Sequence, residues 1–290
     1  MKMKETRYYQ VADHTFCVSG EEPVFGLMDN YTVFQTPEDA CVFSLTVAPG
    51  TAPAYTEELR QEEEGQVIVC GHTADGQPVF EYVWEGETAG WLVCSEDYRE
   101  ARLLTTGKHV KLAIDNALMV LYALSTADKG TVLFHAATVS CHDRGYMFLG
   151  VSGTGKSTHA RLWLKYVEDT ALINDDNPVV RIGADGQATV YGSPWSGKTP
   201  CYRRVSYPLD GIVLLSQAPY NKIERLRGIN AYVALVPSIS GKRWDSAIAD
   251  GLHQTENALA THVPVWHLDC LPDEEAATLC SGTIMNDKER

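Results

Sequence analysis

The centre of the chain reads Gly150-Val151-Ser152-Gly153-Thr154-Gly155-Lys156-Ser157, which matches the phosphate-loop pattern G-x-x-x-x-G-K-[ST] at every fixed position. Three glycines let the backbone curl with its N–H groups pointing inward, and the lysine reaches the β- and γ-phosphates of a nucleotide. The serine hydroxyl, at the start of the next helix, is suited to hold Mg²⁺. We expect a nucleotide to be bound by Gly150, Ser152, Gly153, Thr154, Gly155, Lys156, Ser157 and Thr158.

The segments on both sides of this loop have the apolar patterns of a strand before it and a helix after it. Residues 145–149 are apolar and β-prone, and residues 158–168 place four apolar side chains on one helical face. The alternative is a glycine turn with an incidental lysine, but the order of strand, glycine loop and helix favours a phosphate loop. The sequence therefore predicts a nucleotide site.

The charge balance argues against two classes of partner. The 290 residues include 24 Lys and Arg against 38 Asp and Glu, a formal net charge of −14, and no basic run offsets it. No nucleic-acid partner and no membrane partner are therefore expected. The eight cysteines are scattered without a C-x-x-C pair and indicate reduced core residues, and no segment is apolar enough to span a membrane. Together these features predict a cytoplasmic protein.

Residues 1–107 are expected to form a β-rich N-terminal region. Its β-type runs are 14–19, 41–47, 66–70, 79–84 and 90–95. Ala74-Asp75-Gly76-Gln77 predicts a hairpin turn, because Asp-Gly readily adopts positive φ. Residues 49–65, rich in Pro, Gly, Ala and Glu, predict a surface connection with one exposed helical turn.

Residues 108–290 are expected to form the nucleotide-binding domain. Helical spacing over 110–124 predicts a helix that leads into it. The other expected elements are a hairpin of 132–140 with 145–149, a strand at 171–173, a hairpin of 179–182 with 188–191, strands at 211–215 and 222–226 that pair with each other, a strand at 264–268, and helices at 230–235, 244–261 and 272–280. Hairpins on both sides of the loop require antiparallel neighbours, so the predicted class is α/β (α+β) with a mixed β-sheet.

The chain lacks an acid where common phosphate-loop NTPases carry one. In those proteins a second apolar strand ends in a Mg²⁺-linked Asp. Here the apolar strand 212–215 ends in Ser216-Gln217. Asp175 and Asp176 follow the buried strand 171–173 and are the acids at a comparable place. We therefore expect this pair to lie near the phosphate loop.

A structural interpretation of the two acids is also open. Asn174 and Asn177 flank them, and Asn and Asp side chains commonly stabilise turns between strands. Two adjacent carboxylates do not easily ionise together when buried, so Mg²⁺ or Lys156 is expected to keep them charged.

The sequence around the phosphate loop resembles the catalytic domain of HPr kinase/phosphorylase, within the phosphoenolpyruvate-carboxykinase-like superfamily. The resemblance rests on the order of His135, the hairpin, the phosphate loop and Asp175-Asp176, and on Gly192-Ser193-Pro194-Trp195. It covers residues 132–215. It implies a mixed-sheet phosphate-loop domain that transfers a phosphoryl group between a nucleotide and a serine hydroxyl. Thr158 stands where HPr kinases have a Glu, and their glycine-rich phosphorolysis signature is absent, so the acceptor is left open.

Phosphoryl transfer needs charge neutralisation, alignment and a base near the attacking hydroxyl. Lys156 is expected to bind phosphate, and Ser157 with Asp176 to hold Mg²⁺. The other acid, Asp175, is then the base, although the sequence also allows the reverse assignment. The resemblance places His135 close to the phosphates or the acids; a buried core histidine is the alternative.

Several residues beyond the acid pair are weaker candidates. Arg204, with its neighbour Arg203, is expected to supply a transition-state cation, and a solvated loop pair is the alternative. Lys198 is a further cation of this kind. Trp195 is suited either to stack on a base or substrate or to pack within its turn.

Three functions are compatible with these residues. The first is an ATP-dependent kinase with Mg²⁺ as cofactor, acting on a serine of a protein or peptide or on a small hydroxyl compound. The second is a non-catalytic nucleotide-binding module that regulates or binds peptides. The third is chemistry of the phosphoenolpyruvate carboxykinase type. A homo-oligomer is compatible with the chain, whose sequence specifies no oligomeric state.

Overall fold

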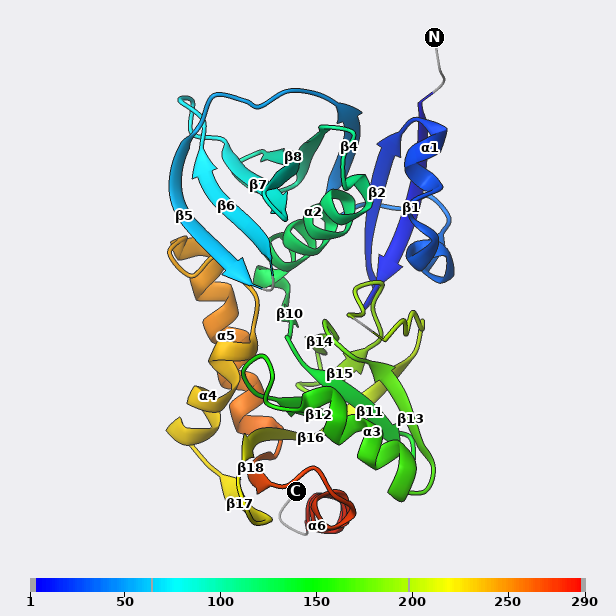
Figure 1. The fold of residues 1–290 in the computed structure, drawn as a ribbon, viewed down its shortest axis with the longest axis vertical. Helices are drawn as coiled ribbons and strands as arrows, with labels where there is room; N and C mark the ends of the chain where they lie inside the picture. The colour runs from blue at the N-terminus through cyan, green and yellow to red at the C-terminus, as the bar shows by residue number, and fades with distance from the viewer. Residues whose placement is uncertain (1–3, 64, 198, 288–290) are drawn as a thin grey trace. The chain divides into compact units, whose positions relative to one another are not determined.

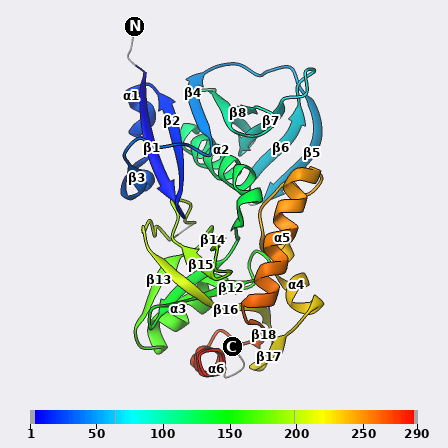
Figure 2. The same cartoon turned by 180° about the vertical axis from the view of Figure 1, so that it is seen from behind.

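The computed structural model describes residues 4–63, 65–197 and 199–287 and divides into two compact units, Met1–Thr126 and Ala127–Arg290. Each unit is built on a large mixed β-sheet, which Figure 1 and Figure 2 show from opposite sides. The predicted α/β (α+β) class is confirmed at this level. No helix in the described part of the chain is both long and apolar enough to cross a membrane.

The described residues of the first unit form a sheet of nine strands. They are β1 (Glu5–Val11), β2 (His14–Gly20), β3 (Gln35–Thr36), β4 (Ser44–Pro49), β5 (Thr56–Glu63), β6 (Gln66–His72), β7 (Pro78–Trp84), β8 (Glu87–Cys94) and β9 (Glu100–Thr105). Their order in the sheet is β3-β1-β2-β4-β9-β8-β7-β6-β5, and β4 is parallel to both β2 and β9. Helix α1 (Glu22–Phe25) and the 3-10 helix η1 (Asp29–Phe34) lie between β2 and β3.

Helix α2 (Val110–Ser125) belongs to the first unit. It packs on β7, β8 and β9, and its Ile114, Leu118 and Leu121 are fully buried. The hydroxyl of Tyr122 donates a hydrogen bond to the carbonyl of Val11 at 2.9 Å. The boundary expected after residue 107 thus differs from the division after Thr126, because the first sheet covers the apolar face of α2.

Residues 56–63 form strand β5, so the predicted surface connection with a helical turn is wrong. β5 pairs with β6 and ends the strand order. Its side chains are exposed on both faces apart from the half-buried Leu59, so the apolar alternation that identifies a strand is missing. Charged side chains on such an edge strand oppose pairing with other sheets.

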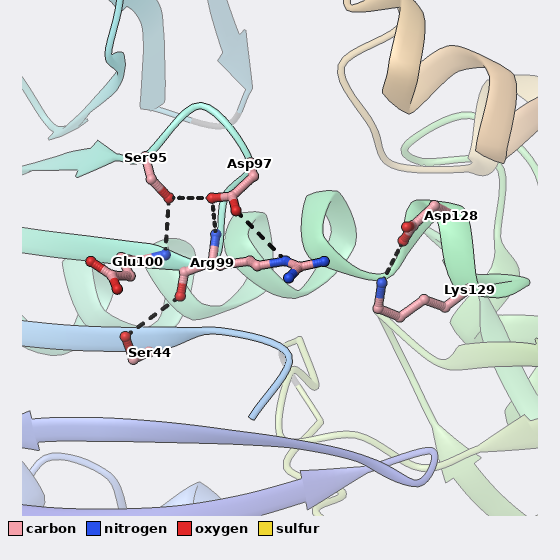
Figure 3. A network of polar contacts seen from close by, with 7 residues as sticks. All are labelled: Ser44, Ser95, Asp97, Arg99, Glu100, Asp128 and Lys129. Carbon is pink, nitrogen blue, oxygen red and sulfur yellow. Dashed lines mark hydrogen bonds and ion pairs between the residues drawn. The ribbon is translucent and has the colours of Figure 1, made fainter. Parts of the chain in front are cut away.

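Polar side chains fix the turn between β8 and β9 (Figure 3). The Ser95 hydroxyl donates to Asp97 at 2.7 Å and accepts from the backbone N–H of Glu100 at 3.0 Å. The backbone N–H of Ser44 donates to the carbonyl of Arg99 at 2.8 Å and joins this turn to β4. These contacts are local and largely exposed, so we interpret the network as structural.

In the second unit, the part of the chain that the structure describes also forms a sheet of nine strands. They are β10 (Thr131–Leu133), β11 (Ala137–Cys141), β12 (Arg144–Leu149), β13 (Thr170–Asn174), β14 (Val179–Ile182), β15 (Ala188–Tyr191), β16 (Ser206–Gln217), β17 (Lys222–Leu226) and β18 (Val265–Cys270). The main order is β10-β14-β15-β16-β12-β11-β13, with β18 beside β16 and β17 beside β18. The helices are η2 (Ala127–Lys129), α3 (Lys156–Tyr166), α4 (Ile229–Leu235), η3 (Val236–Ser238), α5 (Ser246–His262) and α6 (Glu274–Ile284).

The predicted hairpin of 179–182 with 188–191 is confirmed as β14–β15. The hairpin predicted from 132–140 and 145–149 is confirmed only for β11–β12, because residues 131–133 form the separate strand β10, which pairs with β14. The predicted pairing of 222–226 with 211–215 is wrong. β16 is flanked there by β12 and β18, both parallel to it, and β17 pairs with β18 instead. Both edges of this half of β16 are therefore occupied.

One buried cluster supports the loop at the end of β12. Phe148 of β12 packs on Trp163 of α3, with 5.4 Å between ring centroids, and Leu268 of β18 and Cys280 of α6 belong to the same cluster. Burial of α3 against this core fixes the direction in which the helix leaves the loop.

The eight cysteines all lie within the described residues and form no disulfide bond. Five are buried as predicted, whereas Cys17, Cys41 and Cys270 are only partly buried.

Candidate functional site

The phosphate-loop segment connects the end of β12 to the start of α3, as predicted. Gly150, Gly153 and Gly155 have φ values of 150°, 79° and 112°, a region that favours glycine. A Cβ atom at Gly150 would lie 3.1 Å from the side chain of Thr154, and the Thr154 N–H donates to Val151 at 3.1 Å. The glycines thus permit a tight loop at the N-terminus of α3, the kind of place where anions bind.

Lys156 lies across this loop. Its ammonium group donates to the carbonyls of Gly150 at 2.9 Å and Val151 at 3.3 Å, and the residue is only 9% exposed. A buried ammonium group at the N-terminus of a helix is favourably placed to bind an anion such as a phosphate. Ser157 is half-buried, while Ser152 and Thr158 are exposed.

The acid pair follows β13, which pairs with β11. The Asn174 side chain is fully buried and accepts a hydrogen bond from the N–H of Asp176 at 2.8 Å. Its amide donates to the hydroxyl of Ser193 at 3.0 Å and to the carbonyl of Trp195 at 3.2 Å. The Asx turn that was the structural alternative is therefore present, and it also fixes the backbone that carries the carboxylates.

Asp176 lies in the electrostatic field of two predicted site residues. Burial raises the pKa of its carboxyl, while the charges of His135 and Lys156 act in the opposite direction and that of Asp175 raises the pKa further. The N–H of Ala136, next to His135, donates to the carbonyl of Asp176 at 2.8 Å. The structure thus brings His135, Lys156 and the acid pair together.

Asp175 has a different partner. Its side chain is 5% exposed, and its Oδ2 lies 4.0 Å from Nη2 of Arg161, on α3. Its buried Oδ1 has no hydrogen-bond partner among the described residues. Sequence reasoning missed Arg161, since no motif marks it; its position on the helix after the loop was the available signal.

Gln217 was also missed. It ends β16, at the strand end where an acid was sought, and its Nε2 donates to the carbonyls of Gly153 at 3.2 Å and Thr154 at 3.3 Å. The parallel pairing of β16 with β12 brings the two strand ends together. The end of β16, where an acid was expected, therefore carries the side-chain amide of Gln217, which donates to the phosphate loop.

The remaining candidates differ in burial and in partners. Nη1 of Arg203 donates to the carbonyl of Leu172 at 2.5 Å, which gives this guanidinium a structural partner. Arg204 is exposed, and its role as a transition-state cation stays a prediction. Trp195 is 5% exposed, so its indole packs within the turn rather than offering a face for stacking. Lys198 lies outside the described residues.

No group of three or more His, Cys, Asp or Glu side chains with the geometry of a metal site occurs within residues 4–63, 65–197 and 199–287. The chain matches no protein-family model and no curated protein.

Proposed function

We propose that the chain is an ATP-dependent phosphotransferase of the HPr-kinase-like type. It moves the γ-phosphoryl group of ATP to a serine hydroxyl of a protein or peptide, or to the hydroxyl of a small compound. The observation that carries the proposal is the nearness of Lys156, from the phosphate loop, to the carboxylate of Asp176, which lowers the pKa that burial raises. A phosphate loop alone serves nucleotide binding, whereas carboxylates beside it serve phosphoryl transfer.

The residues present are suited to Mg²⁺. The Ser157 hydroxyl and the Asp176 carboxylate are oxygen ligands, and Mg²⁺ at nucleotide sites takes further ligands from phosphates and water. The buried Oδ1 of Asp175, which has no hydrogen-bond partner within residues 4–63, 65–197 and 199–287, is a further acceptor beside Asp176. When bound, Mg²⁺ would neutralise charge on the phosphates.

The chain's own groups supply the rest of the chemistry. Lys156 stabilises negative charge on the transferred group, and the loop amides orient the phosphates. The acceptor oxygen forms the new bond to the γ-phosphorus, the bond to the β-phosphate oxygen breaks, and ADP leaves. The hydroxyl proton passes to the acid of the pair that does not hold Mg²⁺.

Calorimetric titration with Mg-ATP and transfer of ³²P from [γ-³²P]ATP test the proposal together. The acceptors are a library of serine-containing peptides and free L-serine. In the Asp175→Asn/Asp176→Asn double variant we expect ATP affinity within a few-fold of wild type and transfer reduced by about 100-fold or more. Lys156→Ala should weaken ATP binding by about tenfold.

Three results would contradict the proposal. Unchanged transfer in the double variant would exclude the acid pair from the reaction. ATP binding by the wild type without transfer to any acceptor would favour the non-catalytic nucleotide-binding module. Formation of phosphoenolpyruvate from oxaloacetate with Mn²⁺ would instead favour carboxykinase-type chemistry.

A further inference from the structure

Arg161 connects α3 to two segments that are distant in sequence. Nη2 of its guanidinium lies 4.0 Å from Oδ2 of Asp175 and donates to the hydroxyl of Thr199 at 3.2 Å. The same helix begins with Lys156 of the phosphate loop. Because both side chains start from the same helix, the backbone positions of Lys156 and Arg161 are fixed relative to each other.

Residues 193–197, which we call the 193–197 segment, contact the turn that carries the acid pair. The Ser193 hydroxyl donates to the carbonyl of Asn177 at 2.6 Å. A Cβ atom at Gly197 would lie 3.2 Å from the Cβ and Cγ of Asp176, so this backbone is in close contact with the second carboxylate.

The ion pair matters more for the buried Asp175 side chain than for the exposed Arg161 side chain. The arginine side chain is 63% exposed and is hydrated whether or not the pair forms, but the Asp175 side chain is 5% exposed. An exposed pair contributes little to stability, whereas removal of the cation takes away the ion-pair partner that the structure gives this buried carboxylate within the described residues. The planar guanidinium also offers two donors in fixed relative directions, which an ammonium group does not.

We propose that Arg161 is a positioning residue that holds Asp175 and the stretch around Thr199 in register with the phosphate loop. It acts through these two groups, and it is not required to touch the nucleotide. Its effect on turnover rests on the proposed phosphotransfer, whereas its effect on the 193–197 segment does not.

Hydrogen–deuterium exchange of the full chain tests the structural part. Peptides that cover residues 188–204 should exchange about tenfold faster in Arg161→Gln than in wild type, because local opening of the segment becomes easier. Thr199→Val should show the same direction of change, and Arg161→Lys should restore protection only in part. Lys165→Gln removes one positive charge from the same helix and is the matched control, with unchanged exchange in this segment.

Kinetics of Mg-ATP hydrolysis, with water as acceptor, test the catalytic part. In Arg161→Gln we expect kcat to fall about tenfold while KM for ATP stays within twofold, as for a group that orients a catalytic partner. Exchange in Arg161→Gln equal to that of Lys165→Gln would overturn the inference, and so would an equal loss of ATP affinity and kcat. Absence of ATP binding and hydrolysis in the wild type would instead refute the proposed function, and the exchange result would still decide the role of Arg161.

Discussion

The side-chain amide of Asn174 lies 3.0 Å from the hydroxyl oxygen of Ser193, and both residues are fully buried. Ser193 in turn donates to the carbonyl of Asn177, so the two segments on either side of the β14–β15 hairpin are tied together. Because Asn174 also accepts from the N–H of Asp176, this contact sets the position of the acid pair.

Asn174→Ala should therefore destabilise the protein. The change removes the side-chain partner of Asp176 N–H, Ser193 and Trp195 in a buried environment, and the lost hydrogen bonds together cost about 3 kcal/mol. Urea unfolding of the purified protein measures this loss. Thr199→Val, which removes one part-exposed hydrogen bond, is the comparison and should lose less than about 1 kcal/mol. Equal losses in the two variants would contradict this account.

Asp176→Asn should raise the free energy of unfolding at neutral pH. Burial raises the pKa of Asp176 in the folded state, so the folded protein binds this proton more tightly than the unfolded chain does. Its ionisation therefore destabilises the fold as pH rises above the usual range of an Asp, and below that range the variant should have no advantage. Chemical unfolding at several pH values between 3 and 8 measures the difference, and a variant less stable than wild type at pH 7 would be the opposite of this expectation.

Gly197→Ala should impair transfer without weakening ATP binding. The new Cβ would come within 3.2 Å of Asp176 and 3.3 Å of its Oδ2, so either the carboxylate or the loop must shift. A displacement of this size at a catalytic group lowers the transfer rate by about tenfold or more. Gly282→Ala, where nothing lies within 4 Å of the added atom, is the control. The ³²P transfer assay and calorimetry separate rate from affinity, and normal transfer in Gly197→Ala would exclude a close role for this loop.

His159 should make stability fall as pH drops from about 6.5 to about 4. It is buried in α3, its Nε2 accepts from the indole N–H of Trp163 at 3.2 Å, and burial lowers its pKa to about 4. The unfolded chain therefore takes up the proton first, which amounts to roughly 3 kcal/mol of lost stability across this range.

His159→Gln, which keeps an acceptor for Trp163, should remove that part of the pH dependence. Thermal unfolding of both proteins between pH 4 and 7 provides the measurement. The same slope in the variant would assign the pH dependence to other groups.

Local patterns in the sequence were sufficient to predict several features of the fold and the site. The phosphate loop and α3 follow from glycine spacing and helical periodicity, and the hairpins β11–β12 and β14–β15 follow from paired β-type runs with turn residues. Asp175 and Asp176 were found because they directly follow a buried strand. In each case the signal lies within a few residues of the feature that it predicts.

Only the tertiary structure decided the rest. β5 carries no apolar alternation because its faces stay exposed, and its strand character comes from hydrogen bonds to β6. The sheet that covers α2 determines the unit to which that helix belongs. Arg161 and Gln217 carry no motif, and their contacts with Asp175 and the phosphate loop arise from parallel strand pairing and the packing of α3. Such contacts join segments that are far apart in the chain, so their energy depends on the whole fold, whereas turns and helical faces depend on neighbouring residues alone.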